Sequence, residues 1–214
     1  MTDSDLKKAW QSLPENAPEK LVDKILMPAM LNALGFGSDE WHPEFATGRG
    51  SDVVDFAARR NNDNKDLFVY SQLNPFVLIE IKGRNVNLKR GQGYIDTVAQ
   101  IKRYLHPVSK NSLTAKWGII TNGDNIQLFR RHGRVSYPYT QIINLNATNI
   151  DEKIALIQKY ISHEERALCV ASYNNKGGVG KTTTIINVAA TLSLPPYNKK
   201  VLVLTTRTKK RERG

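Results

Sequence analysis

The most constraining feature of the sequence is a short apolar stretch, residues 75–83, that carries two opposite charges near its end. Its apolar run between a proline and a glycine predicts a buried β-strand. Such a strand should not carry Glu80 and Lys82 without a reason, because unpaired buried charge is costly. Alternate residues of a strand share a face, so these two side chains point one way and Ile81 points the other. The pair is either a structural ion pair, which this strand alone favours, or half of a metal-dependent phosphodiesterase site.

A second apolar stretch, residues 53–58, also carries a single carboxylate, Asp55. The polar turn at residues 61–66 separates it from the first stretch, which predicts an antiparallel strand pair with Asp55 across from Glu80. Two carboxylates at one place repel each other unless a cation lies between them. Mg²⁺ is the natural candidate, since it takes oxygen ligands from carboxylates and substrate phosphates. Lys82 would then orient or deprotonate a water and offset charge on the phosphate.

The remaining patterns predict helices and strands in alternation. Apolar spacing predicts a helix over about 17–34, kinked at Pro28, and another over 94–106 that places Gln100 and Tyr104 on one face. Alternating residues predict a hairpin of strands 117–121 and 125–130, a weaker strand at 142–145 and a final helix over 149–165. Together these elements predict an α/β fold.

Charge and cysteine content narrow the setting. The formal net charge is +11, but residues 166–214 account for +9 of it and residues 1–165 for only +2. The single cysteine, Cys169, leaves no disulfide framework and no cysteine zinc site, which fits a reducing, cytoplasmic protein. No apolar run approaches the roughly 18 residues of a membrane span, so we expect no membrane association.

Three elements, in order and spacing, resemble the PD-(D/E)xK nuclease superfamily. They are Asp55 in a Val-Asp-Phe-Ala stretch, the Glu80-Ile81-Lys82 strand, and Gln100 with Tyr104 on the following helix. The nearest likeness is to the N-terminal nuclease domain of type I restriction-enzyme R subunits, over roughly residues 17–145. The resemblance implies a mixed β-sheet flanked by helices and Mg²⁺-dependent, or Mn²⁺-dependent, hydrolysis of DNA phosphodiester bonds.

The resemblance also implies a role for each matching residue. The metal ligands would be Asp55, Glu80 and the carbonyl of Ile81. Lys82 would be the catalytic lysine, with Gln100 and Tyr104 as auxiliary catalytic residues. A leading helix offers a further acidic residue in this family, for which Glu19 is the first candidate and Glu44 the second.

Basic residues cluster around these elements. A solvated surface explains any one cluster by itself. Beside a nuclease site, however, we expect phosphate contacts, which position DNA without specifying its sequence. The expected contacts are Arg84, Lys89, Arg90, Arg130 and Arg131.

A second motif lies at residues 176–184 and has the strand–loop–helix setting of a P-loop, with an apolar strand expected at 168–171. Its residue pattern is similar to the deviant Walker motif of ParA/MinD-type ATPases. In that family the extra lysine, which corresponds to Lys176 here, reaches the nucleotide of a partner subunit. Glycine backbone and a helix N-terminus attract phosphates. The expected nucleotide-binding residues are Lys176, Gly178, Gly180, Lys181, Thr182 and Thr183.

The context after the P-loop departs from that family. Residues 201–204 look like its second strand, but Thr205 and Thr206 stand where the family has a metal-binding aspartate. We therefore interpret this part as a truncated, frame-shifted or split piece of such an ATPase, able to bind ATP weakly without hydrolysing it.

The sequence thus predicts two parts: a restriction-endonuclease-like nuclease domain at 1–165 and a partial P-loop fragment at 166–214. Two alternatives stay open, the N-terminal portion of a ParA-type partition ATPase and a non-catalytic DNA-binding module on the nuclease fold. The expected partners are DNA, a motor or ATPase subunit acting in trans, and a second copy in a homodimer.

Overall fold

The computed structural model of the chain describes residues 3–63, 65–163, 170–173, 176, 178–195, 197 and 199–204. The chain divides into two compact units, Met1–Glu164 and Glu165–Gly214, and each is described by itself. Within the described ranges, no helix has the length and apolar character needed to cross a membrane.

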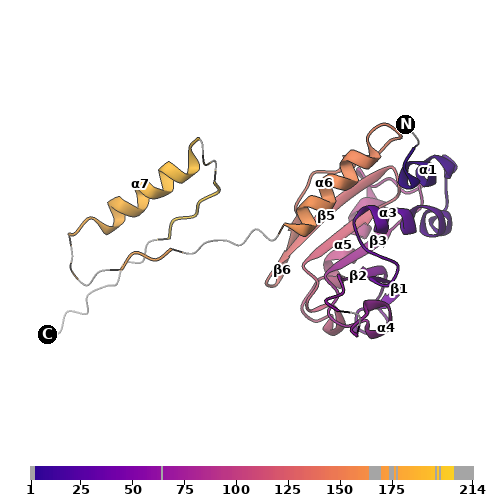
Figure 1. Cartoon of the computed structure of the whole chain (residues 1–214), viewed down its shortest axis with the longest axis horizontal. Helices are drawn as coiled ribbons and strands as arrows, with labels where there is room; N and C mark the ends of the chain where they lie inside the picture. The colour runs from indigo at the N-terminus through magenta and orange to yellow at the C-terminus, as the bar shows by residue number, and fades with distance from the viewer. Residues whose placement is uncertain are drawn as a thin grey trace. The chain divides into compact units, whose positions relative to one another are not determined.

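The first unit is built on one seven-stranded sheet (Figure 1). Its strands are β1 (Trp41–Ala46), β2 (Val53–Ala58), β3 (Val77–Ile81), β4 (Trp117–Thr121), β5 (Asn125–His132), β6 (Val135–Pro138) and β7 (Ile143–Asn144). They run in the order β1 to β6, and β7 pairs with β5 at one end. Only β3 and β4 pair in parallel; all other pairs are antiparallel. The sheet is therefore mixed, as expected from the sequence.

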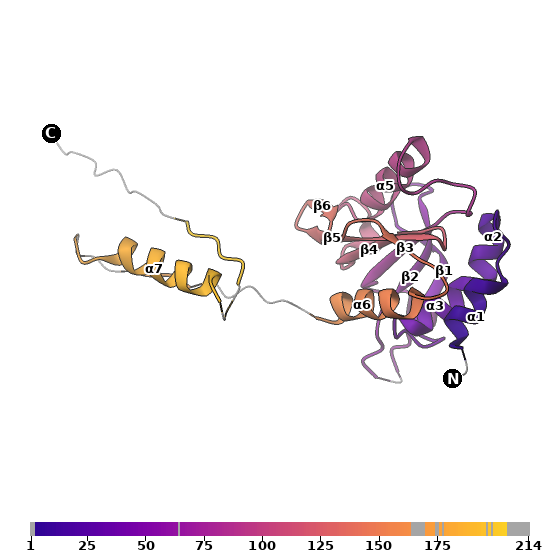
Figure 2. The same cartoon turned by 90° about the horizontal axis from the view of Figure 1, so that it is seen from above.

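Helices cover both faces of this sheet (Figure 2). One face carries α5 (Gln92–Tyr104) and α4 (Phe68–Ser71), whose buried side chains pack with those of β2, β3 and β4. The other face carries α1 (Asp5–Ser12), α2 (Glu19–Leu21), α3 (Met27–Ala33) and α6 (Ile150–Ser162). β3 is buried along its whole length, because it lies between two strands and under two helical layers.

The helix expected over 17–34 is interrupted by a π-helical segment. It begins at Glu19 after Pro18, becomes π-helical over Val22–Leu26, and resumes as α3. A regular α-helix would press the ring of Pro28 against the carbonyl four residues earlier and would leave that carbonyl without a donor. The wider π turn just before Pro28 relieves this conflict, so the sequence predicted the disturbance but not its form.

The second unit contains α7 (Lys181–Ser193) and has no buried residue among those described. The strands expected at 168–171 and 201–204 are not formed in their described parts, 170–171 and 201–204; residues 168–169 lie outside the described residues. A strand needs hydrogen-bonded neighbours, and an isolated one is not stable in water. Apolar side chains such as Leu202 and Leu204 therefore stay exposed.

Candidate functional site

The antiparallel pair β2–β3 brings Asp55 to Glu80. Phe56 pairs with Ile79, and the next position of this register sets Asp55 across from Glu80, as the sequence predicted. The backbone ladder ends there, and Asp55 Oδ2 instead accepts a hydrogen bond from the Ile81 N–H at 2.6 Å. A side chain thus replaces a backbone carbonyl where the two strands diverge, which fixes the carboxylate at the end of β3.

Lys82 completes this group from the residue after β3. Its Nζ lies 2.6 Å from Glu80 Oε1 and 3.8 Å from Glu19 Oε2. The approach of Glu19 depends on Gly83, because a side chain there would meet the backbone of residues 17–19. The expected shared face of Glu80 and Lys82 is confirmed, and Glu19 lies at the exposed rim beside them.

Burial makes the two carboxyls unusually weak acids. It raises the pKa of Glu80 to about 7, and the Asp55 charge adds to this, while the ion pair with Lys82 only partly offsets it. Burial also raises the pKa of Asp55. The pKa of Lys82 is raised as well, since its interactions with Glu80, Glu19 and Asp55 outweigh the effect of burial. The site therefore holds an ammonium beside two carboxyls whose pKa values are raised by burial, that of Glu80 to about 7.

This electrostatic arrangement predicts a pH dependence of stability without metal. Because the pKa of Glu80 is raised from about 4.5 to about 7, the folded state keeps a proton that the unfolded state releases in that window. We expect the free energy of unfolding to fall as pH rises through it, by roughly 3 kcal/mol. Urea denaturation in EDTA from about pH 5 to about pH 8 measures this, with Glu80→Gln as comparator. Parallel profiles for the two proteins would contradict the expectation.

Tyr104 faces the same group from α5. It is buried, and its pKa rises to about 12 through burial and then through the charge of Glu80. Gln100 lies one turn earlier on α5 and is half-buried, and no hydrogen bond described joins it to the carboxylates. Sequence reasoning missed Asp52, which accepts from Arg103 Nε at 2.9 Å and so ties the start of β2 to α5 beside Tyr104. Its only sequence signal is its position three residues before Asp55.

Glu44 does not join this group. It is exposed on the edge strand β1 with a φ of 48°, an uncommon conformation for a residue other than glycine. Its charge contributes to a raised pKa of Asp23, after burial, and not to the shifts of Asp55 or Glu80. Of the two acidic candidates, the structure brings only Glu19 toward Lys82.

The residues present fit a divalent cation. Glu80 is 3% exposed, and its Oε2 is buried without any hydrogen-bond partner. A buried carboxyl oxygen of this kind needs either a proton or a positive partner. Among the described residues no group of three or more His, Cys, Asp or Glu side chains is placed to hold a metal. A cation here would therefore rest on Asp55 and Glu80, with the Ile81 carbonyl and substrate or water oxygens completing its shell.

The expected phosphate contacts need correction. Arg84 is wrong: it donates to the carbonyls of Trp10, Leu13 and Pro14, and its side chain is only 5% exposed. The Arg131 guanidinium also donates to carbonyls, those of Leu105, Ser112 and Leu113, but this residue is only half-buried, so its phosphate contact stays a prediction.

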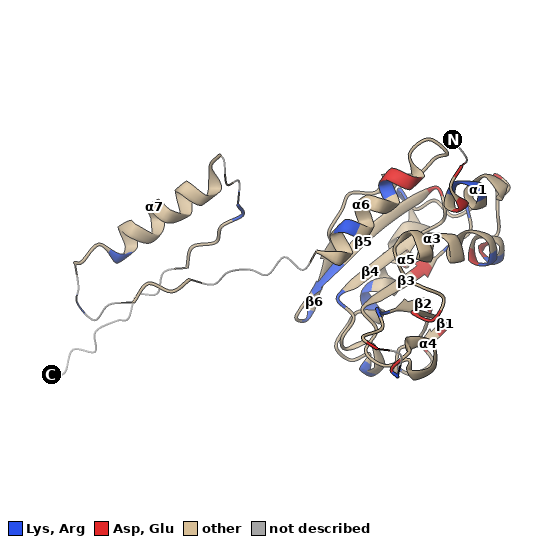
Figure 3. Cartoon of the chain, viewed as in Figure 1, with Lys and Arg blue, Asp and Glu red and all other residues tan. Residues whose placement is uncertain are grey.

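The other three predicted contacts differ from these two. Arg130 is half-buried and stacks on Trp117, with 4.2 Å from its guanidinium carbon to the ring centroid. Lys89 and Arg90 are exposed. Segments with basic and with acidic residues are both scattered over this unit (Figure 3). Composition alone cannot separate an arginine that holds backbone from one that is available to a ligand.

Arg84 instead joins the loop after β3 to the N-terminal segment. Its Nε lies 3.1 Å from Asp124 Oδ1, and its guanidinium stacks on Trp10. We expect Arg84→Ala to lower the free energy of unfolding by about 2–4 kcal/mol, because three carbonyls lose their donor and Asp124 loses its ion-pair partner. Arg84→Lys should restore little, since an ammonium lacks the planar fork. Urea denaturation beside the exposed control Arg90→Ala measures this; equal stability of the alanine variants would contradict it.

The second unit shows a P-loop geometry at the start of α7. Gly178 and Gly180 have φ values of 74° and 77°, which glycine adopts without strain. Lys181 opens the helix, and its Nζ donates to the Lys176 carbonyl at 2.7 Å, across the loop. Thr182 and Thr183 follow in the exposed first turn. The expected nucleotide-binding residues therefore lie at one helix N-terminus.

The fold and site of the first unit define an α/β nuclease-like fold: a mixed sheet between helices, with two carboxylates and a lysine where two strands diverge. Comparison of the chain with protein families agrees. Residues 44–144 match the family described as the N terminus of the type I restriction enzyme R protein, and residues 167–208 match an AAA domain. Both resemblances inferred from the motifs are confirmed. No curated protein and no solved structure matches the chain.

The first match runs from the second half of β1 to the end of β7 and includes Asp55, Glu80, Lys82 and Tyr104. It begins after Glu19, so the helices that bring this residue to Lys82 are not part of the matched region. The similarity to the type I restriction R protein thus rests on the sheet and α5.

Proposed function

We propose that residues 1–165 form a metal-dependent DNA endonuclease domain like that of type I restriction R subunits. The observation that carries the proposal is the meeting of Asp55, Glu80 and Lys82 at one buried point of the sheet, with an unpartnered Glu80 oxygen. The match over residues 44–144 supports the same reading. The proposal also assigns this chain to a reducing, cytoplasmic setting, in keeping with its single cysteine.

Each residue has a distinct part in the proposed mechanism. Bound Mg²⁺ or Mn²⁺ would supply charge stabilisation and a more acidic water at the scissile phosphate. Asp55 and Glu80 would hold it, while the Ile81 N–H keeps Asp55 oriented. In the hydrolysis, a water oxygen bonds to phosphorus, the bond to one sugar oxygen breaks, and that oxygen takes up a proton.

Lys82 fits the role of an ammonium better than that of a base. Its raised pKa keeps it protonated beside Glu80 and Glu19. A fixed positive charge at this point would stabilise the negative charge that develops on the phosphate. Tyr104, whose raised pKa keeps it a neutral hydroxyl, would donate a hydrogen bond from α5.

The direct test is incubation of the full chain with supercoiled plasmid and Mg²⁺ or Mn²⁺. We expect nicked or linear product with either metal and none in EDTA. The same reaction with ATP, with and without a candidate motor subunit, tests whether cleavage needs a partner. Absence of product from folded protein in all these reactions would refute the endonuclease and leave a DNA-binding module on the nuclease fold.

A second function is favoured for residues 166–214 by the AAA-domain match and the P-loop geometry. We propose that Lys181 and the loop amides bind nucleotide phosphates without hydrolysis. A fluorescent ATP analogue should bind the full chain and lose affinity in Lys181→Ala, with no phosphate release by either protein. Equal binding by both would reject the site, and phosphate release would favour the partition-ATPase reading.

A further inference from the structure

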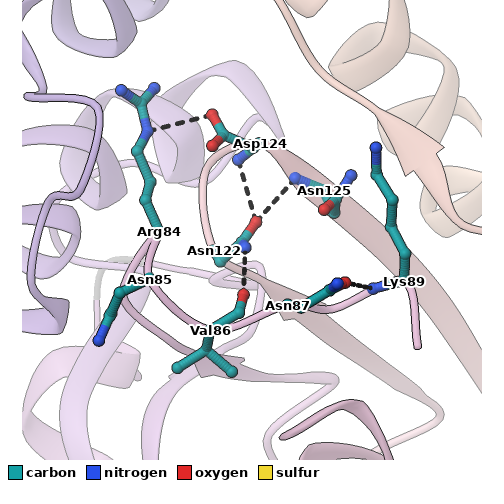
Figure 4. A pocket seen from close by; sticks show the side chains of 8 residues that line it. All are labelled: Arg84, Asn85, Val86, Asn87, Lys89, Asn122, Asp124 and Asn125. Carbon is teal, nitrogen blue, oxygen red and sulfur yellow. Dashed lines mark hydrogen bonds and ion pairs between the residues drawn. The ribbon is translucent and has the colours of Figure 1, made fainter. Parts of the chain in front are cut away.

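A polar cleft of about 310 Å³ lies directly after the proposed catalytic strand (Figure 4). Its walls are the loop between β3 and α5 and the hairpin between β4 and β5. The lining residues are Arg84, Asn85, Val86, Asn87, Lys89, Asn122, Asp124 and Asn125. Seven of these eight residues are polar, which favours a polar ligand, and the volume lies at the lower end of small-molecule sites.

Hydrogen bonds hold the hairpin and the loop that form the walls of this cleft. Asn122 is 2% exposed and donates to the Val86 carbonyl at 2.8 Å, which joins the loop to the hairpin. Its Oδ1 accepts from the N–H groups of Asp124 and Asn125, so the hairpin turn is held as well. Arg84 is fixed by backbone carbonyls and by Asp124. The cleft is therefore formed before any ligand arrives.

Three side-chain groups at the cleft have no hydrogen-bond partner among the described residues. Asn87 Oδ1 accepts the Lys89 N–H at 2.8 Å, and no partner is described for its Nδ2. Asn125 Nδ2 donates to Asn144, and no partner is described for its Oδ1. The Lys89 side chain is exposed and acts electrostatically on Asp124 across the cleft. An amide donor, an amide acceptor and an ammonium thus belong to residues that line one cleft.

We propose that this cleft binds one unpaired nucleotide of the DNA strand, with its base edge on Asn87 and Asn125 and its phosphate on Lys89. An amide donor beside an acceptor complements a base edge, as asparagine does with adenine, and a lysine complements a phosphate. A base stacked inside a duplex could not enter a cleft, so the ligand is a single-stranded segment or end. The inference rests on the proposed function in taking DNA as the ligand.

The test compares two fluorescent 12-nucleotide single strands with the same phosphates, one with normal bases and one fully abasic. Anisotropy titrations in EDTA prevent cleavage. We expect the wild-type chain to prefer the strand with bases by about fivefold or more. Asn87→Asp keeps the acceptor for the Lys89 N–H but removes the donor, and should abolish that preference. Lys89→Ala should weaken binding of both strands about equally and lower the salt dependence by about one phosphate contact.

Matched controls separate these effects from charge and folding. Asn62→Asp and Lys65→Ala make the same changes at exposed positions of the β2–α4 turn and should behave like the wild type. A wild-type chain without base preference, an Asn87→Asp variant that keeps it, or an Asn62→Asp variant that loses it equally would overturn the inference. If the base preference fails but the wild-type chain cleaves plasmid, only the nucleotide-binding inference is refuted. If the expected binding pattern is found but no plasmid is cleaved, the proposed endonuclease is refuted and the nucleotide-binding cleft is retained.

Discussion

Replacing Lys82 by alanine is expected to lower the rate of Mg²⁺-dependent plasmid cleavage by at least about a hundredfold. The ammonium is 2.6 Å from Glu80 and is held in place by carboxylates on two elements. Removing a fixed charge from the point where negative charge develops typically costs a factor of this size. The loss of nicked product over time measures it, with Lys65→Ala, an exposed lysine, as control.

Folding must be separated from catalysis in this experiment, because Lys82→Ala also leaves Glu80 buried without its cation. Lys82→Arg provides the separation: arginine keeps the positive charge and an ion pair, but it presents a larger, planar group to the phosphate. We expect it to retain most of the stability and little of the activity. Near-wild-type cleavage by either Lys82 variant would exclude this residue from the catalytic machinery.

Replacing Asp55 by asparagine is expected to remove both cleavage and metal binding while keeping the fold. The amide oxygen can still accept from the Ile81 N–H, so the divergence of β2 and β3 is preserved. The negative charge is lost, and a neutral amide is a weaker ligand for Mg²⁺. We expect Mn²⁺ or Mg²⁺ to raise the melting temperature of the wild type but not of Asp55→Asn, and cleavage to fall at least about a hundredfold.

Asp55→Ala provides the contrast, because it removes the acceptor as well as the charge. The buried Ile81 N–H would then lack a partner, at a cost of about 1–3 kcal/mol in the free energy of unfolding. The two variants should therefore share the loss of metal-dependent stabilisation and differ in stability without metal. Retained metal stabilisation in Asp55→Asn would show that the cation rests elsewhere.

The sequence by itself determined most of the candidate site and five strands of the sheet, β2, β3, β4, β5 and β7, whereas β1, β6 and the strand order emerged only from the tertiary structure. A buried strand can be predicted from sequence because an apolar run that carries two charges has few explanations. The meeting of Asp55, Glu80 and Lys82 then follows from the alternation of side chains along a strand and from one antiparallel pairing. The hairpin at residues 122–124 and the helix that carries Tyr104 were also local patterns. Such features depend on neighbours within a few positions along the chain.

Only the tertiary structure decided which charged side chains stay available to bind a ligand or to take part in catalysis. Arg84 and Lys89 are equally basic in sequence, yet the first is enclosed by the N-terminal segment and the second stays exposed. Glu19 reaches Lys82 because Gly83 lets a distant backbone segment approach, whereas Glu44 stays exposed on β1 and does not affect the pKa of Asp55 or Glu80. Hydrogen bonds between segments distant in sequence determine which charged side chains are enclosed and which stay exposed. The cleft beside Asn87 is formed by contacts of the same kind. No local pattern records them, because burial and partners are properties of the folded chain.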